Sequence, residues 1–132
     1  MKHNQQIGQW GEQTAAEYIK ELGYEILARN ARTPYGEIDI VAKHDDVTIF
    51  VEVKTLTSSR NFFPEYNVTA RKREHMLHAA QHYAAEHEIN HWQIDVIAIE
   101  GRPNTKSVIT YFENAITWSE IQIGRPGCQI PN

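Results

Sequence analysis

The stretch Gly36–Thr55, GEIDIVAKHDDVTIFVEVKT, decides the fold of this chain. It consists of two runs rich in β-branched and apolar residues, separated by a short polar break, and this pattern is typical of a β-hairpin. If Asp45-Asp46 forms a two-residue turn, the register of the hairpin follows directly. In that register Asp39 lies opposite Glu52.

The charged side chains of this hairpin indicate a site. Side chains alternate along a strand, so Glu52 and Lys54 point to the same face, roughly 7 Å apart. Asp39 and Glu52 face each other with Cβ atoms about 5 Å apart, and two like charges in such a pair destabilise a sheet. A divalent cation between them is the natural candidate, because hard cations prefer carboxylate oxygens. The alternative is that all three side chains face solvent on a one-sided sheet.

The apolar residues of the hairpin favour the first interpretation. Ile38, Ile40 and Ala42 are expected on one face, and Val41 and Phe50 on the other. A hairpin that is apolar on both faces is usually covered on both. Charged groups within it are then partly buried, and partly buried charges need partners.

Length and composition narrow the class of protein. The 132 residues suit one domain with a modest core, and we expect residues 1–118 to form it, followed by an irregular tail at 119–132. The hydrophobic content of 41% and charged content of 23% are ordinary for a globular protein. No apolar run approaches the roughly 20 residues of a membrane span. The N-terminus lacks the apolar core of a signal peptide. The single cysteine excludes an internal disulfide, so we expect a cytoplasmic protein.

Periodicity and turn signals divide the rest of the chain into further elements. We expect a helix over 7–22 that stops at Gly23, and a second helix with Thr69 as its N-cap. The expected elements in order are the helix 7–22, a strand at 24–31, the hairpin, a loop at 56–68 containing Phe62-Phe63, the helix 69–88, and strands at 92–100 and 107–113. This order predicts an α/β fold with a mixed sheet flanked by helices.

Three charged residues on the predicted helices have more than one explanation. Glu12 lies at the edge of the first helix's apolar stripe, where it has either a catalytic role or a favourable interaction with the helix dipole. Lys72 and Arg73 lie at the N-terminal end of the second helix, where cations oppose the dipole. A nearby anion is therefore indicated: the acidic cluster, a phosphate, or both. The alternative is that both side chains snorkel to solvent.

Other motifs carry less weight. The string His87-Glu88-Ile89-Asn90-His91 matches the HExxH pattern of zinc proteases, which requires both histidines within one helix. Because the helix is expected to end inside this string, we interpret the match as accidental, with a zinc enzyme as a minor hypothesis. The buried acid Asp95 is expected to accept structural hydrogen bonds. A row of histidines on the second helix forms either a solvated face or a zinc or nickel site: His75, His78 and His82.

Several segments follow one another in the order of a known family. They are residues 8–12, 36–42, 50–55 and 94–98, together with Val68, Lys72 and Tyr83. On these residues the chain resembles the PD-(D/E)XK nuclease superfamily and, more narrowly, its small YraN-like bacterial family. The match extends over about residues 7–113. It implies a restriction endonuclease-like core of helix, three strands, helix and strand, with Mg²⁺ or Mn²⁺ as cofactor.

The resemblance also implies roles for individual residues. Asp39 and Glu52 would be metal ligands, and Lys54 would orient or activate water. Glu12 would be the helix-borne acid of resolvase-like members. Lys72 would contact a phosphate.

Two functions follow as hypotheses. The first is a Mg²⁺-dependent endonuclease acting on DNA, branched or flapped, and working as a homodimer as junction-cutting relatives do. Its phosphate contacts would come from four cations: Arg60, Arg71, Lys72 and Arg73. The second is a non-catalytic nucleic-acid or protein adaptor that keeps the nuclease fold. It is motivated by the net charge of −4 and by uncharged residues, Leu56 and Gln93, where the family often has basic ones.

Overall fold

The predicted order of elements is confirmed. The structure is a computed structural model that describes residues 2–56 and 69–118. Its two helices and five strands are α1 (Lys2–Glu21), β1 (Glu25–Thr33), β2 (Gly36–His44), β3 (Val47–Leu56), α2 (Ala70–Glu86), β4 (Trp92–Glu100) and β5 (Val108–Ile116). The predicted loop with Arg60 and Phe62-Phe63, and the predicted tail at 119–132, lie outside the described residues.

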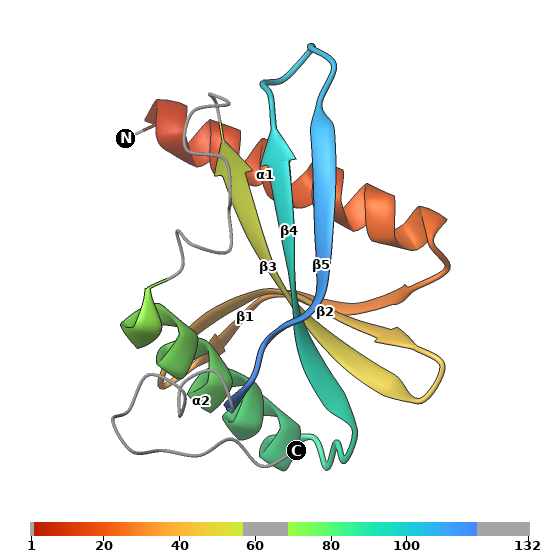
Figure 1. The fold of residues 1–132 in the computed structure, drawn as a ribbon, viewed down its shortest axis with the longest axis vertical. Coiled ribbons are helices and arrows are strands. Elements are labelled where there is room, and N and C mark those ends of the chain that lie inside the picture. The colour runs from red at the N-terminus through yellow and green to blue at the C-terminus, as the bar shows by residue number, and fades with distance from the viewer. Residues whose placement is uncertain (1, 57–68, 119–132) are drawn as a thin grey trace, which may run out of the picture.

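The strands form one mixed sheet in the order β1-β2-β3-β4-β5 (Figure 1). The central neighbours β3 and β4 are parallel, and the other three pairs are antiparallel. Parallel neighbours need a crossover connection, and α2 lies in it. The mixed sheet is therefore as predicted, with Glu52 on the central strand β3 and Asp95 on its parallel neighbour β4.

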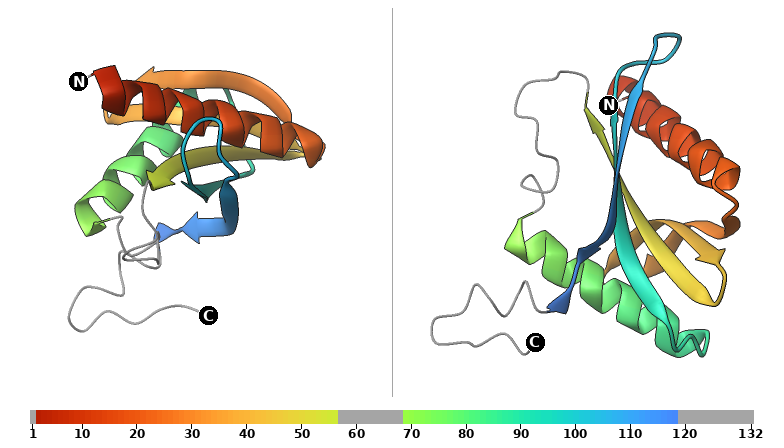
Figure 2. Two further views of the ribbon diagram at one scale, coloured as in Figure 1. Left: turned by 90° about the horizontal axis from the view of Figure 1, so that it is seen from above. Right: turned by 45° about the vertical axis from the view of Figure 1, so that its right-hand side comes forward.

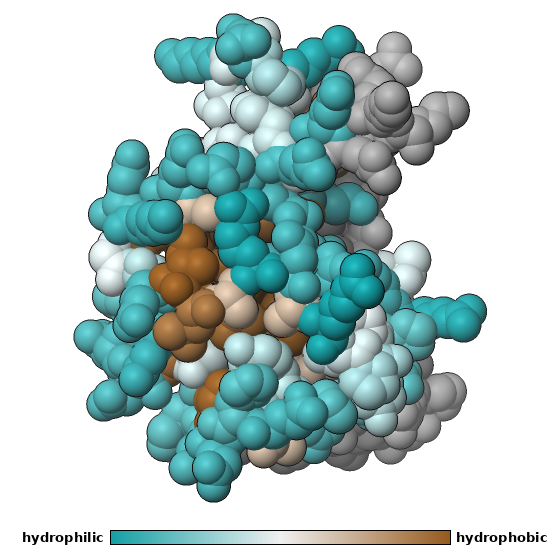
Figure 3. Space-filling view, turned by 180° about the vertical axis from the view of Figure 1, so that it is seen from behind, coloured by the Kyte–Doolittle hydropathy of each residue, from teal (hydrophilic) through white to brown (hydrophobic). Residues whose placement is uncertain are grey.

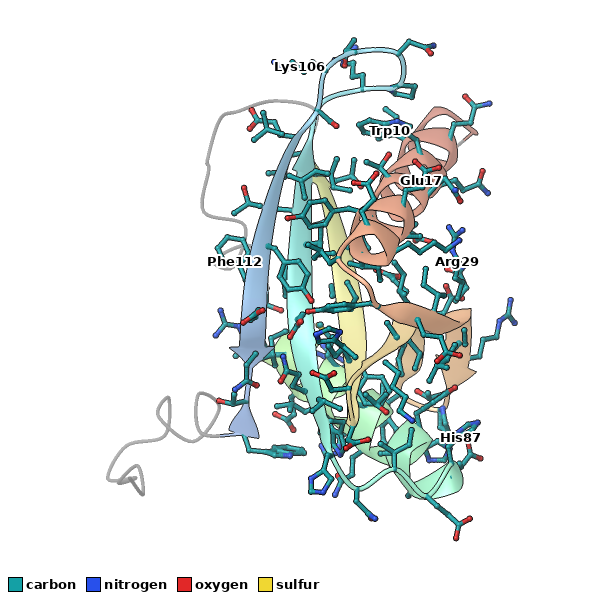
Figure 4. The ribbon with its side chains drawn as sticks, turned by 90° about the vertical axis from the view of Figure 1, so that its right-hand side faces the viewer. Trp10, Glu17, Arg29, His87, Lys106 and Phe112 are labelled. Atoms are coloured by element: carbon teal, nitrogen blue, oxygen red, sulfur yellow. The ribbon has the colours of Figure 1, made fainter. Side chains whose placement is uncertain are left out.

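The two helices cover opposite faces of the sheet (Figure 2). Each helix forms its own hydrophobic core with the face it covers. Figure 4 shows Trp10 and Phe112, which pack in different cores, on opposite sides of the sheet. The α1 core contains Ala15, Ala16, Ile19, Ile40, Ala42, Ile49, Val51, Ile97 and Ile99. The α2 core contains Ile38, Val41, Phe50, Leu77, Ala79, Ala80, Ala84, Ile94, Val96 and Ile116.

The first helix begins earlier than its apolar pattern predicts. It starts at Lys2 instead of residue 7 and ends at Glu21, and Gly23 beyond it adopts a φ of 93° that stops the helix, as predicted. The amide groups of Gly23 and Tyr24 donate to the carbonyls of Lys20 and Ile19, which is the Schellman arrangement. Since α1 starts at Lys2, Glu12 lies in its middle and not in its first turn. The explanation of Glu12 as an acid that favours the helix dipole is therefore wrong.

A glycine lets α1 approach the sheet closely beside Glu12. A Cβ atom added to Gly11 would lie 2.1 Å from Thr55 Oγ1 and 3.2 Å from Thr55 Cβ. The first distance is a steric overlap, so a larger residue here would force α1 or the Thr55 side chain to shift. By contrast, a Cβ atom at Gly8 would meet nothing within 4 Å. Gly11 thus sets the distance between α1 and β3, and with it the position of Glu12.

The hairpin has the predicted register. His44 pairs with Val47 across the Asp45-Asp46 turn, and the pairing continues to Ile40 and Val51. Asp45 adopts a φ of 55°, the left-handed conformation that two-residue hairpin turns use. One step beyond the Ile40–Val51 pair, the register places Asp39 opposite Glu52.

The prediction for Ile38 is wrong, because the strand does not keep simple alternation. Ile38 packs in the α2 core and Ile40 in the α1 core, although they are two residues apart. Asn30 of β1 lies opposite Asp39, between the pairs Arg29–Ile40 and Ala31–Ile38. It adopts a φ of 52°. A left-handed residue interrupts the alternation of a strand, and the side-chain direction changes there in both strands.

Much of the surface seen from behind the sheet is hydrophilic, with one area where hydrophobic residues gather (Figure 3). Several large hydrophobic side chains of the described residues remain exposed, among them Leu22, Leu27 and Tyr35. Neither helix of the described residues is long and apolar enough to cross a membrane.

Candidate active site

Two carboxylates meet beside Asn30, where the direction of the side chains along β2 changes. The side chain of Asp39 accepts a hydrogen bond from the Val53 amide at 2.9 Å. The carboxyl groups of Asp39 and Glu52 lie within hydrogen-bonding reach of each other. Only 16% of the Glu52 side chain is exposed. We refer to Asp39 and Glu52 as the acid pair.

The environment of the acid pair opposes two negative charges. Burial, and then the charge of Asp39, raise the pKa of Glu52 to about 7. Burial also raises the pKa of Asp39, against the lowering effect of the Val53 amide and of Lys72. Both shifts mean that the fold disfavours full negative charge on these two carboxyl groups unless a positive charge lies beside them. The pair therefore offers a place for a cation.

Two further acids lie beside the pair. Burial and the charge of Asp39 raise the pKa of Glu12, so α1 brings this residue close to β2. With its amide oriented to satisfy both contacts, Asn30 donates to Glu12 Oε1 at 3.0 Å and to Glu37 Oε1 at 3.3 Å. Glu37 also lies near Asp39, whose pKa its charge raises. The structure thus brings the predicted Glu12 to the site and adds Glu37.

The predicted cations differ in how they lie relative to the acid pair. Lys72 lies in the first turn of α2, and its Nζ is 3.8 Å from Glu52 Oε2, so the anion expected near it is present. Lys54 follows Glu52 by two residues on β3, and its positive charge lowers the pKa of Glu52. Arg71 is exposed and Arg73 is half-buried, both in the same turn of α2. The N-cap Thr69 accepts from the Lys72 amide at 3.1 Å, as predicted.

The donor set fits a divalent cation that also binds substrate. Across residues 2–56 and 69–118, no group of three or more acidic, histidine or cysteine side chains is placed to hold a metal ion. Mg²⁺ in phosphate-transfer sites commonly takes one or two carboxylates and completes its shell with water and substrate phosphates. Asp39 and Glu52 supply that number of carboxylates. Their raised pKa values show that their negative charge is not fully balanced by the protein.

A third buried acid, Asp95, is satisfied in a different way. It is fully buried, and its Oδ1 accepts from Gln93 Nε2 at 2.9 Å and from the Asn114 amide at 2.8 Å. Its Oδ2 accepts from the Tyr111 hydroxyl. Burial, and then this contact, raise the pKa of Tyr111, which stays a hydrogen-bond donor. The structural role predicted for Asp95 is confirmed.

The HExxH string does not form a zinc site. Helix α2 ends at Glu86, His87 is its C-cap, and Glu88 adopts a φ of 54°. The two histidines therefore do not lie one turn apart on a helix, as zinc proteolysis requires. Figure 4 shows His87 at the far end of α2 from the N-terminal turn that carries Lys72.

The histidine row of α2 is not simply solvated. The ring of His78 stacks on Tyr35 with centroids 5.2 Å apart, and His82 meets Tyr35 at 6.1 Å in an edge arrangement. His78 and His82 also lie 3.9 and 3.5 Å from Glu74 and Glu86. His75 is exposed on the same helix.

Two residues of the site were missed in the sequence. Glu37 precedes Asp39 by two positions, a spacing that places both near one another on a strand. Asn30 interrupts an otherwise regular strand, and asparagine is both depleted in strands and tolerant of left-handed backbone. Together these signals indicate an irregularity in the strand at Asn30 and a further acid, Glu37, beside the acid pair.

Comparison with known proteins points to one protein family. The sequence profile described as "Uncharacterised protein family UPF0102" matches residues 11–99, which include Glu12, the acid pair and Lys72.

Individual relatives match over most of their length. A UPF0102 protein of Syntrophotalea carbinolica is 45% identical over 104 residues, covering 77% of this chain and 85% of the relative. A UPF0102 protein of Syntrophomonas wolfei is 39% identical over 114 residues, covering 83% and 99%. One from Roseiflexus castenholzii is 41% identical over 96 residues, covering 70% and 77%. The names of these relatives state no activity or ligand.

Proposed function

This chain belongs to the uncharacterised protein family UPF0102, the YraN-like family, and we propose that it is a metal-dependent endonuclease that hydrolyses DNA phosphodiester bonds. The observation that carries the proposal is the acid pair itself. Two carboxylates are held face to face beside a lysine at 3.8 Å; burial raises the pKa values of both, and the charge of Asp39 raises that of Glu52 further. A stable sheet gains nothing from this arrangement, whereas a site for a divalent cation requires it.

The residues around the pair suit phosphodiester hydrolysis. Mg²⁺ or Mn²⁺ held by Asp39 and Glu52 would supply a Lewis acid for a phosphodiester oxygen and a bound water of lowered pKa. Lys54 positions the attacking water and offsets negative charge that develops in the transition state. Burial and the charge of Asp39 raise the pKa of Glu12, which makes its carboxylate a stronger acceptor for a proton from that water.

The first turn of α2 supplies the contacts to the DNA backbone. This turn carries Arg71, Lys72 and Arg73. Lys72 is the one that reaches the acid pair, with its Nζ 3.8 Å from Glu52 Oε2. A local group of cations suffices to bind a short stretch of phosphates even though the whole chain carries a net charge of −4. Arg60, outside the described residues, and a homodimer remain predictions.

An adaptor that keeps the fold without cutting DNA is the second candidate. It is favoured by the ion pair between Lys72 and Glu52, which partly balances the acid pair without a metal. An adaptor need not bind Mg²⁺ or Mn²⁺ at the pair. Calorimetric titration with Mn²⁺ therefore separates the two candidates, and specific binding that Asp39→Asn removes would exclude this form of the adaptor.

The decisive experiment measures cutting. Purified protein is incubated with Mg²⁺ or Mn²⁺ and single-stranded, duplex, flapped and four-way-junction DNA. Glu52→Ala and Lys54→Ala are tested beside it, and both should lower the cutting rate by a factor of about 1,000 or more, as removal of transition-state stabilisation does. Lys43→Ala is the matched control, because Lys43 is an exposed lysine near the other end of the hairpin. Unchanged cutting by Lys54→Ala would refute the assigned mechanism.

A further inference from the structure

A hollow lies next to the candidate active site and shares Lys72 with it. Its volume is about 200 Å³, and it lies between the β1–β2 turn and the first half of α2. Among the described residues, its lining includes Tyr35 and Glu37 from the hairpin side and Lys72, His75, Met76 and Ala79 from the helix. It therefore combines an aromatic ring, an apolar floor, a carboxylate and a lysine.

The ring of Tyr35 is held in place although it is exposed. It lies in a two-residue turn and is 48% exposed, one of the large hydrophobic side chains of the described residues that remain in contact with solvent. His78 stacks on it at 5.2 Å with 28° between the ring planes, and His82 meets it edge-on. An exposed turn residue that two neighbouring rings fix is already oriented, so a ligand that stacks on it loses little additional side-chain entropy.

Lys72 connects the hollow to the acid pair. It lines the hollow, and its Nζ lies 3.8 Å from Glu52 Oε2. A phosphate that pairs with Lys72 thus lies next to the carboxylates. The attached sugar and base then extend towards Tyr35, at the other side of the hollow.

Glu37 determines which part of a nucleotide enters. Its carboxylate repels a phosphate, so the side of the hollow that it lines suits a base and not a second phosphate. A carboxylate also accepts hydrogen bonds from the exocyclic amino groups of bases, as acids do with the N4 amino group of cytosine. Met76 and Ala79 supply apolar contacts for the ring.

We propose that this hollow binds one unpaired nucleobase, stacked on Tyr35, with its phosphate at Lys72. The inference rests on the proposed nuclease function and specifies its substrate: DNA with an unpaired nucleotide beside the bond that is cut. A base inside a duplex is stacked and paired, and it reaches such a pocket only after leaving the helix at the expense of that stacking. Single-stranded, flapped and branched DNA offer unpaired bases directly. The protein should therefore bind these forms in preference to a blunt duplex.

The test measures binding without cutting. The affinities of a fluorescein-labelled single strand and a blunt duplex of the same sequence are measured by anisotropy with Ca²⁺ in place of Mg²⁺. Stacking contributes enough per base that Tyr35→Ala should weaken binding of the single strand about 5- to 100-fold. Duplex binding should change less than about twofold. Tyr35→Phe keeps the ring and should bind both DNAs as the unmodified protein does.

A second exposed side chain provides the matched control. Leu27 lies near the start of β1, at the opposite end of that strand from the turn with Tyr35, and is 45% exposed. Leu27→Ala should leave both affinities unchanged. Equal single-strand binding by Tyr35→Ala and the unmodified protein, or an equal loss for the duplex, would overturn the inference.

Cutting assays separate this inference from the proposed function. If Tyr35→Ala cuts flapped and duplex DNA in the same ratio as the unmodified protein, the inference fails while the nuclease stands. If the protein binds single strands through Tyr35 but cuts no DNA with Mg²⁺ or Mn²⁺, the inference stands while the nuclease fails.

Discussion

The sheet carries two acidic centres, and they differ in how their charge is balanced. Asp95 on β4 receives three hydrogen bonds, from Gln93, the Asn114 amide and the Tyr111 hydroxyl. The two carboxyl groups of the acid pair, on β2 and β3, face each other, with one backbone amide and the lysines Lys72 and Lys54 nearby. Asp95 sits at an irregularity in the pairing of β4 and β5, and the acid pair sits at the change of side-chain direction beside Asn30.

The difference distinguishes a structural acid from a binding site. A buried carboxylate that accepts hydrogen bonds on both oxygens is complete within the fold. Two carboxylates whose pKa values are both raised by burial are incomplete, because the fold disfavours the negative charge that they carry in the unfolded chain. Removing Asp95 should therefore destabilise the protein, whereas neutralising the acid pair should not.

The largest expected effect is on stability. Asp95→Ala leaves the Asn114 amide and the Tyr111 hydroxyl without their acceptor and should lower the free energy of unfolding by about 3–5 kcal/mol. Asp39→Asn removes one of two opposed charges and should leave stability at pH 8 unchanged or higher. Urea denaturation followed by circular dichroism measures both. Equal destabilisation by the two variants would contradict the distinction.

The next effect is a dependence of stability on pH. The folded state raises the pKa of Glu52 from 4.5 to about 7, so between these values it binds more protons than the unfolded chain. The contribution of Glu52 to stability is therefore largest below pH 4.5 and falls as the pH rises towards 7. The loss is up to about 3 kcal/mol, and Asp39, whose pKa is also raised, changes stability in the same direction. Denaturation in EDTA at pH 5 and pH 8 measures it, and Glu52→Gln should reduce the difference.

Cation binding should reverse that loss. A divalent cation at the acid pair binds the folded state only, and at 100 times its dissociation constant it stabilises the protein by about 2.7 kcal/mol. Thermal unfolding at pH 8 with and without Mn²⁺ measures the effect. Asp39→Asn should abolish the shift, while Asp46→Asn, at an exposed acid of the hairpin turn, should retain it. A shift that persists in Asp39→Asn would place the cation elsewhere.

The smallest effect separates two glycines of α1. Gly11→Ala places a methyl group 2.1 Å from Thr55 Oγ1 and should destabilise the protein by about 1–3 kcal/mol, because α1 must move away from β3. Gly8→Ala meets nothing within 4 Å and should stabilise the helix by about 0.5–1 kcal/mol. Thermal unfolding of both variants tests this. If cutting is found, Gly11→Ala should also reduce it, since Glu12 moves with the helix.

Much of the fold could be predicted from the sequence because the hairpin determines its own register. The two-residue turn fixes the pairs from His44–Val47 to Ile40–Val51, and counting one step further predicts Asp39 beside Glu52. The start of α1 could not be predicted, since residues 2–6 carry no apolar periodicity. The face occupied by Ile38 was predicted wrongly, because the conformation of Asn30 on the neighbouring strand decides it.

Some residues of the candidate site could likewise be predicted from local spacing, and others could not. Residues on one hairpin, such as Glu52 and Lys54, follow from spacing alone. Glu12 required the resemblance to a known family, because the distance between a helix and a strand is not encoded in local periodicity. The partners of Asp95 were not predictable, since Tyr111 and Asn114 reach it through an irregular pairing of two strands.

The change of side-chain direction at Asn30 links the site to the cooperative unfolding of the whole domain. Ile38 and Ile40 anchor the backbone on either side of Asp39 in different cores, one under each helix. If either helix detaches, one anchor is lost and Asp39 no longer faces Glu52. Partly folded forms of the chain, such as those present during synthesis, would then lack the acid pair. In native-state hydrogen exchange, the Val53 amide, which donates to Asp39, should open only with the global unfolding reaction.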